Sequence, residues 1–137
     1  MSFHIDIVSL AGNIFSGEIE RISVPAIEGE MTILARHMPV VAPLGVGEVV
    51  VKSPGKTLNI SIGKGIFEFS GGRARLLVED AINSDEISED RALEAKKRAE
   101  ELLAKGIKGE EKLEVTYQLR KSLIDLKIVR RKKKRVF

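Results

Sequence analysis

The chain has 137 residues, of which 43% are hydrophobic and 31% are charged, and it carries a formal net charge of +3 and no cysteine. This length accommodates one ordinary domain, or a smaller domain with an appendage, and the missing cysteines exclude a disulfide framework and thiol chemistry. The longest apolar stretch, residues 38–46, contains two prolines and is shorter than the roughly 18 residues that a membrane-spanning helix needs.

The first half of the chain alternates apolar and polar residues, as half-buried strands do. This pattern predicts strands over Phe3–Ile7 and Glu18–Val24. Two further segments, residues 49–62 and 67–78, contain glycine-bearing turns between such strands and predict hairpins. Strands that recur at short intervals with turns between them are typical of a sandwich or a barrel.

The segment from Val24 to Val50 has a high concentration of residues with special backbone conformations, with three prolines and three glycines between short apolar runs. Pro25 fixes its own φ angle and has no N–H donor, and Gly29 between two glutamates suits a turn that needs positive φ. We expect short strands and tight turns here, with a tip that is held in place.

The hydrophobic period changes after Val78. A helix is predicted from Ser88 to Lys105, because Ser88 suits the N-cap and acidic residues follow it in the first turn. Gly106 and Gly109 interrupt the pattern, and a second helix should run from near Glu110 to Arg131 or beyond. The first helix has a stripe of small apolar residues, namely Ala92, Ala95, Ala99 and Leu102. The second has a broader apolar side, namely Leu113, Tyr117, Leu119, Leu123, Ile124, Leu126 and Ile128.

Strands followed by helices indicate two modules. The sequence therefore predicts an α+β fold, with an N-terminal antiparallel β-sandwich over residues 1–84 and a C-terminal antiparallel helical hairpin with a basic tail over residues 85–137. The segment Asn83–Glu86 is the expected hinge between them.

The basic residues are concentrated in the second module. Residues 1–84 hold 7 Lys and Arg against 9 Asp and Glu, and residues 85–137 hold 16 against 11, which makes net charges of −2 and +5. The most basic run comprises Arg130, Arg131, Lys132, Lys133, Lys134 and Arg135. It fits a solvated tail at a helix C-terminus, a contact with an acidic protein surface, or nucleic-acid binding, although no aromatic residue is interleaved for base stacking.

No catalytic constellation stands out. The chain has only two histidines, no G-x-S-x-G motif and no distinctive carboxylate pair. We therefore expect no enzyme activity, no catalytic residue, no metal site and no required cofactor.

Four motifs together resemble one family. Residues 28–40 read E-G-E-M-T-I-L-A-R-H-M-P-V and resemble the E-G-E-x-G-I-L-P-G-H-A-P-L signature of the epsilon subunit of bacterial and chloroplast F-type ATP synthases. Residues 5–9 and 14–18 resemble the D-I-V-S-P and V-F-S-G-E motifs of that family, and residues 65–78 resemble its G-G-F-x-E-V-x-x-N-x-V-x-V run. The similarity covers nearly the whole chain.

The resemblance implies a non-catalytic subunit of the central stalk. Its expected partners are the gamma subunit, the c ring and the catalytic beta and alpha subunits, without nucleic acid. The C-terminal helices would inhibit ATP hydrolysis by docking the basic run on an acidic loop of beta. Asp6 interrupts the N-terminal apolar run and no basic n-region precedes it, so no secretory signal is expected. The chain would lie at the cytoplasmic face of a bacterial cell membrane, as a peripheral component held only through the complex.

In the family, loops around the signature face the c ring and gamma, with Glu30, Met31 and His37 at the matching positions. The alternative for His37 is a surface or turn histidine.

Some members bind ATP through an I/L-D-x-x-R-A motif. Arg91 and Ala92 match it, and Arg98 has the spacing of a further phosphate-facing arginine, which makes ATP a candidate regulatory ligand. The motif Asp, however, is Ser88, which removes a carboxylate that could hold adenine or brace the arginine. The residues favour a helix N-cap with Arg91 in a surface ion pair.

Two other classes of function stay open on the sequence. A basic-tailed nucleic-acid- or ribosome-associated protein would use the C-terminal run for binding phosphates. A small-molecule-binding regulator without a rotary partner would use the Arg91 motif.

Overall fold

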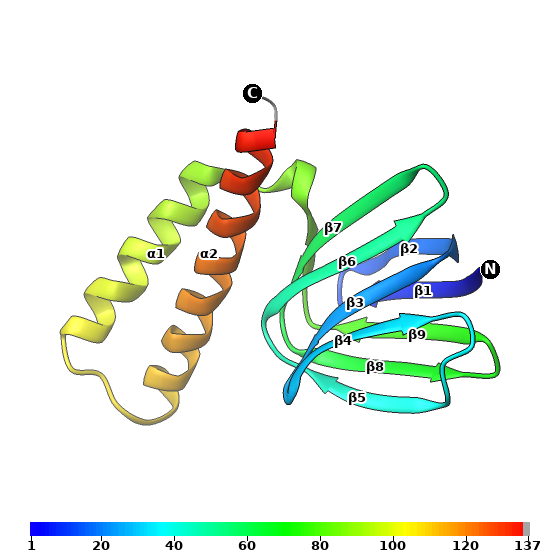
Figure 1. The fold of residues 1–137 in the computed structure, drawn as a ribbon. Coiled ribbons are helices and arrows are strands. Elements are labelled where there is room, and N and C mark those ends of the chain that lie inside the picture. The colour runs from blue at the N-terminus through cyan, green and yellow to red at the C-terminus, as the bar shows by residue number, and fades with distance from the viewer. Residues whose placement is uncertain (136–137) are drawn as a thin grey trace. The chain divides into compact units, whose positions relative to one another are not determined.

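The protein is described by a computed structural model that covers residues 1–135, without the side chain of Arg135. The chain forms two compact units, Met1–Asn83 and residues from Ser84 onward. The first unit holds the strands and the second holds the helices (Figure 1).

The first unit contains ten strands. They are β1 Phe3–Ser9, β2 Gly12–Ile19, β3 Arg21–Ala26, β4 Gly29–Leu34, β5 Val40–Leu44, β6 Gly47–Ser53, β7 Lys56–Ile62, β8 Gly65–Ser70, β9 Arg73–Val78 and β10 Ala81–Asn83. Their order in the sheet is β10-β7-β6-β3-β5-β8-β9-β1-β2, and β4 pairs with β3. All pairs are antiparallel except β1 with β9.

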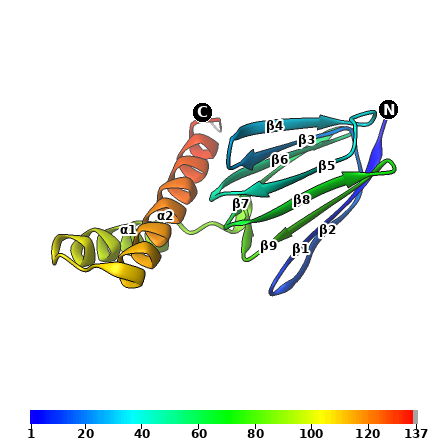
Figure 2. The same ribbon diagram turned by 90° about the horizontal axis from the view of Figure 1, so that it is seen from below.

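The sheet folds over on itself to form two layers. Figure 2 shows β3, β4 and β6 in one layer and β1, β2 and β9 in the other. The layers join where β3 meets β5, at the pair Ala26 and Leu44. Hydrogen bonds of 3.0 Å flank this junction, from Ile27 N to the Pro43 carbonyl and from Gly45 N to the Pro25 carbonyl. The predicted β-sandwich is therefore confirmed, and its shape approaches a barrel.

The prediction of one strand over Glu18–Val24 is wrong. β2 ends at Ile19 and β3 begins at Arg21, so the chain passes from one layer to the other at Glu20. There the Glu20 N–H donates a 2.7 Å hydrogen bond to the Lys52 carbonyl at the end of β6. Apolar residues on both sides of the corner are buried, so periodicity alone conceals the break.

The core lies between the two layers and follows the period of two. In β1 and β9 every second residue is buried, as the sequence pattern predicts. Phe3 and Phe69 meet edge to face across the core, with 5.4 Å between ring centroids. The buried residues are Phe3, Ile5, Ile7, Ile19, Ile22, Val24, Ile33, Leu44, Val49, Val51, Ile60, Ile62, Phe67, Phe69, Ala74, Leu76 and Val78.

Both predicted hairpins and the turn at Gly29 are confirmed. β6 and β7 pair up to Ser53 and Lys56, and β8 and β9 pair up to Ser70 and Arg73. In the second hairpin, Gly71 and Gly72 have φ angles of 60° and 74°, the left-handed conformation that such two-residue turns require.

The second unit is an antiparallel helical hairpin. After the short 3-10 helix η1 (Ser84–Glu86), α1 spans Glu89–Ala104 and α2 spans Gly109–Arg135. Ser88 is the N-cap of α1, with its hydroxyl accepting from Arg91 N at 3.3 Å. Gly106 follows the helix with a φ of 79°. The predicted helices and N-cap are thus confirmed.

The predicted apolar side of α2 is partly wrong. Leu113 and Leu123 are exposed, whereas Val115, which the prediction omitted, is buried. Val115, Ser122 and Leu126 are spaced by seven and four residues and so lie on one face of the helix. The Ser122 hydroxyl donates to the Gln118 carbonyl at 2.9 Å, which satisfies it within that buried face.

Within residues 1–135, no helix has the length and apolar character needed to cross a bilayer.

The closeness of β8 and β9 gives a test of the packing. A Cβ atom added at Gly65 would lie 2.2 Å from the Leu77 carbonyl oxygen and 2.8 Å from Val78 Cα. Since β9 is held between β8 and β1, its backbone has little room to shift. We expect Gly65→Ala to lower the free energy of unfolding by about 1–3 kcal/mol, measured by thermal unfolding followed by circular dichroism.

Gly45→Ala is the matched control, because a Cβ there meets no atom within 4 Å and neither glycine has positive φ. It should unfold within about 0.5 kcal/mol of the parent. Equal stability of the two variants would contradict the inferred close packing.

Candidate interaction surfaces

The sandwich has an open end between β4 and β5. β4 pairs only with β3, and β5 pairs with β8 and, at Leu44 alone, with β3. The two facing strand edges enclose a groove of about 520 Å³, lined by residues 26–31 and 40–43. We call this the open-end groove. Strand edges of this kind offer unpaired N–H and C=O groups to a partner.

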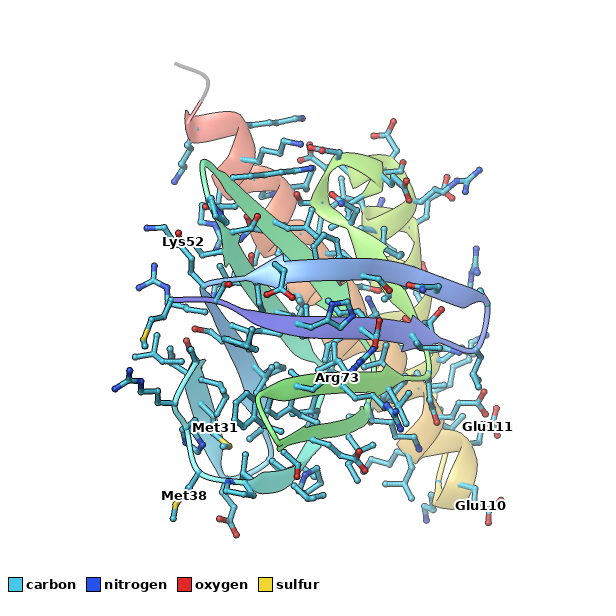
Figure 3. The ribbon with its side chains drawn as sticks, turned by 90° about the vertical axis from the view of Figure 1, so that its right-hand side faces the viewer. Met31, Met38, Lys52, Arg73, Glu110 and Glu111 are labelled. Carbon is cyan, nitrogen blue, oxygen red and sulfur yellow. The ribbon has the colours of Figure 1, made fainter. Side chains whose placement is uncertain are left out.

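Two of the predicted contact residues line the open-end groove. Glu30 is exposed at the start of β4, next to the turn that carries Glu28, and Met31 is half-buried beside it. Met31 and Met38, labelled in Figure 3, come from β4 and from the loop that follows it. The groove thus combines an acidic rim with a flexible apolar side chain, a composition that suits a protein contact.

His37 has structural partners within the sandwich unit. Its backbone N–H donates to the Leu34 carbonyl at 3.0 Å, and its Nδ1 lies 2.6 Å from the Met38 carbonyl oxygen. The imidazole also meets Phe69 edge to face, with 6.2 Å between centroids. His37 therefore helps to hold the loop after β4, and its contact with a partner stays a prediction.

A second surface was missed by the sequence reading. Pro43, Ile66 and Leu77 are cross-strand neighbours on the outer face of β5, β8 and β9. Together with Leu10 and Ile27, which are 86% and 68% exposed, they line a hollow of about 440 Å³. We call these five residues the apolar row.

The signal for the apolar row was present but ambiguous. Leu77 follows Leu76 and Ile66 precedes Phe67, so each strand has one apolar residue beyond its alternating pattern. Only the register of three strands places those extra residues side by side. Contiguous exposed apolar patches are typical of protein-interaction surfaces, which makes the apolar row a candidate for one.

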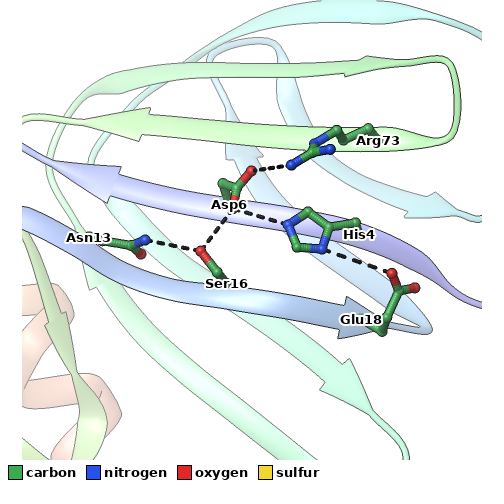
Figure 4. A network of polar contacts seen from close by, with 6 residues as sticks. All are labelled: His4, Asp6, Asn13, Ser16, Glu18 and Arg73. Carbon is green, nitrogen blue, oxygen red and sulfur yellow. Dashed lines mark hydrogen bonds and ion pairs between the residues drawn. The ribbon is translucent and has the colours of Figure 1, made fainter.

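A polar network covers the outer face of β1 and its two neighbours. Figure 4 shows its six side chains, which are His4, Asp6, Asn13, Ser16, Glu18 and Arg73. At the centre, one Asp6 oxygen accepts from the Ser16 hydroxyl at 2.8 Å and lies 3.1 Å from His4 Nε2. The other Asp6 oxygen lies 3.4 Å from an Arg73 nitrogen.

This network lowers the pKa of Asp6. The Ser16 hydroxyl lowers the pKa most, followed by the His4 hydrogen bond, and Arg73 has a smaller effect in the same direction. The partial loss of hydration acts in the opposite direction and raises the pKa. Together they bring the pKa from 3.8 to about 2. The carboxylate thus links β1 to β2 and to β9, which is a structural role that sequence reading did not identify.

The basic run at the end of α2 is paired with acids at the start of the helical unit. Arg130 Nε lies 3.5 Å from a Glu89 oxygen, and Lys133 contacts the other oxygen of the same carboxylate. Lys132 pairs with Asp85. Because these contacts favour the ionised form, mainly through Lys133, the pKa of Glu89 is lowered.

The remaining members of the basic run differ in their surroundings. Arg131 is half-buried and Lys134 is exposed, while the side chain of Arg135 lies outside the described residues. The prediction of a solvated tail is therefore incomplete, since three of its cations have partners within the unit.

The residues of the nucleotide motif do not form an enclosed site in α1. Arg91 and Arg98 are exposed, Ala92 is buried, and Ser88 caps the helix through the N–H of Arg91. The capping interpretation of Ser88 is confirmed, and ATP binding stays a prediction.

Both units of the chain are similar to known proteins. Residues 2–84 match the model of the ATP synthase delta/epsilon chain beta-sandwich domain, and residues 85–129 match that of the delta/epsilon chain long alpha-helix domain. An "ATP synthase epsilon chain 1" of Methylococcus capsulatus is 45% identical over 105 residues, which are 76% of this chain and 75% of that protein. An "ATP synthase epsilon chain" of Dehalococcoides mccartyi is 34% identical over 131 residues, 95% of this chain and 94% of that protein.

A similar fold occurs in a chain of the Euglena gracilis mitochondrial ATP synthase, solved as an OSCP/F1/c-ring assembly. The TM-score is 0.73 at 20% identity, over 91% of this chain and 78% of that one.

The Asp6 network predicts a pH-dependent contribution to stability. Because the folded-state pKa lies below the ordinary value, the stabilisation is present above about pH 4 and is lost as the pH falls towards 2. We expect Asp6→Asn to lower the melting temperature at pH 7, with the difference from the parent shrinking between pH 4 and 2. Thermal melts over this range measure it.

Glu28→Gln, which removes an exposed carboxylate elsewhere on the sandwich, should follow the parent at every pH. A difference for Asp6→Asn that stays constant down to pH 2 would show that the charge of Asp6 is not what stabilises the fold.

Proposed function

The chain belongs to the delta/epsilon-chain family of ATP synthase, and we propose that it acts as a non-catalytic subunit of the central stalk of an F-type ATP synthase. In this role it couples the catalytic head to the c ring through the gamma subunit. The observation that carries the proposal is the match of both family domains, in order, over residues 2–129.

This role needs two lasting contacts, one with gamma and one with the c ring. The two surfaces of the sandwich suit these contacts. The apolar row offers an exposed hydrophobic face for a lasting contact with gamma. The open-end groove, with the acidic Glu28 and Glu30 on its rim, offers a polar contact for the c ring. His37 supports this end of the sandwich from within, through Phe69 and the Met38 carbonyl.

The helical hairpin is the proposed brake on ATP hydrolysis. α2 ends in Arg130, Lys132 and Lys133, whose long side chains can exchange one acidic partner for another. The catalytic head would supply that acidic surface when the hairpin inserts. A two-state element of this kind is biased by whichever acidic surface binds the cations better.

The competing hypothesis of a nucleic-acid- or ribosome-associated protein has no support. The family match concerns an ATP synthase subunit, and three cations of the basic run have acidic partners within the unit. The family match likewise gives no support to a regulator that acts alone through the Arg91 motif.

No required cofactor enters this proposal, and ATP has at most a regulatory role. With Ser88 as a helix cap in place of the motif Asp, Arg91 and Arg98 are the residues left to bind phosphates. The subunit would be held at the cytoplasmic face of the membrane through the complex alone.

The proposal predicts separate roles for the two units. Added to the matching alpha/beta/gamma core, the full chain should suppress ATP hydrolysis several-fold, and a chain that ends at Asn83 should bind without suppressing it. The reason is that the sandwich has its own closed core, whereas the basic end belongs to the helical unit. Steady-state hydrolysis and co-sedimentation measure the two effects.

Failure of both chains to bind the core would overturn the stalk assignment. Equal hydrolysis with the two bound chains would overturn the brake and leave the coupling role intact.

The contact through the apolar row predicts a specific defect. A lysine at Leu77 would place a charge within a desolvated interface, so Leu77→Lys should weaken binding to the matching gamma subunit about tenfold or more. Arg75→Gln is the control, because Arg75 is exposed two residues earlier on the same face of β9 and lies outside the row. Both variants should melt like the parent, and equal affinities would reject the row as the gamma contact.

A further inference from the structure

The basic end of α2 is held by a set of acids at the start of the helical unit. The antiparallel turn at Gly106–Gly109 returns the chain so that residues 130–133 lie beside Asp85 and Glu89. Glu89 receives two cations on its two carboxylate oxygens, and its side chain is only 24% exposed. We call these five residues the clip: Asp85, Glu89, Arg130, Lys132 and Lys133.

The clip joins helix ends that already favour these charges. Glu89 occupies the first turn of α1, where the helix dipole and the free N–H groups stabilise a negative charge. Arg130, Lys132 and Lys133 lie in the last turns of α2, where the dipole favours positive charge. The two helices therefore attract each other at this end without any ligand.

We infer that Asp85 and Glu89 act as an internal substitute for an acidic partner, so that Arg130, Lys132 and Lys133 bind an external acidic surface only when these pairs have opened. The inference rests on the proposed function only for the identity of that external surface, which would be the acidic surface of the catalytic head. It adds a specific regulatory contact: the strength of the internal pairs sets how readily the hairpin opens.

The arrangement of charges favours this over a merely solvated tail. A single exposed ion pair contributes little, but here one carboxylate is shared by two cations and a second acid lies within the same unit. Each cation can satisfy either the internal acid or an external one, so the two contacts compete for the same charges.

Opening can be measured in the full chain, which contains no native cysteine. Spin labels on cysteines introduced at Glu94 and Lys127, both exposed and outside the clip, report the distance between α1 and α2. The variant Asp85→Asn with Glu89→Gln should raise the population with long distances about threefold at low salt. The parent should reach a similar population in about 1 M salt, where the screening length is about 3 Å.

Two further variants separate the clip from general charge effects. Glu100→Gln with Glu101→Gln removes two exposed acids from the same helix and should leave the distances unchanged. Lys132→Gln with Lys133→Gln leaves the first turn of α1 and the Arg130–Glu89 pair intact, so it should also open the hairpin, to a smaller extent than the acid variant does. If only the acid variant opens it, the effect comes from the dipole of α1 and the clip is rejected.

Competition with an external acid is tested with a ten-residue peptide of alternating Asp and Glu. It should bind the Asp85→Asn, Glu89→Gln variant about threefold more tightly than the parent at low salt, and the Glu100, Glu101 variant should bind as the parent does. Equal affinities of all three proteins would overturn the inference.

These experiments use no ATP synthase. A functioning clip in a chain that does not suppress hydrolysis would therefore reject only the proposed brake. If the chain suppresses hydrolysis but the clip variants change neither the distances between the spin labels nor the affinity for the peptide, only the clip is rejected.

Discussion

The junction between β3 and β5 is the constraint on which the sandwich surfaces depend. One residue pair, Ala26 and Leu44, and the flanking hydrogen bonds of Ile27 and Gly45 join the strands of the two layers at this edge. Ile27 and Pro43 line the open-end groove and also belong to the apolar row. These two surfaces lie on either side of the junction. Because the layers separate immediately beyond it, the same short segment borders both hollows of the sandwich.

The helical unit has a smaller set of contacts, which includes ion pairs between the charged ends of two antiparallel helices. Its buried side chains are few and small on α1, where Ala92 and Ala99 are buried, so apolar adhesion between the helices is modest. The ion pairs of Glu89 and Asp85 therefore have a larger share in holding the hairpin than they would in a well-packed bundle.

Local patterns predicted most of the fold. The alternation in β1 and β9, the Gly71-Gly72 turn and the Ser88 cap are each decided within a few residues, and each was read correctly. The break at Glu20 was missed because buried apolar residues continue on both sides of the corner. The apolar side of α2 was partly misplaced, since Leu113 is apolar but exposed while Ser122 is buried and bonded to its own helix.

The sequence by itself determined the two modules, their order, the family they resemble and the concentration of positive charge at the C-terminus, because these depend on local composition and period. Only the tertiary structure decided what those charges and apolar residues contact. Leu77 and Ile66 become one surface through strand register, His37 packs on Phe69 through the return of the chain at β8, and Lys133 meets Glu89 through the turn between the helices. Each of these pairings joins residues distant in sequence, and no local pattern specifies which distant residue will be the neighbour.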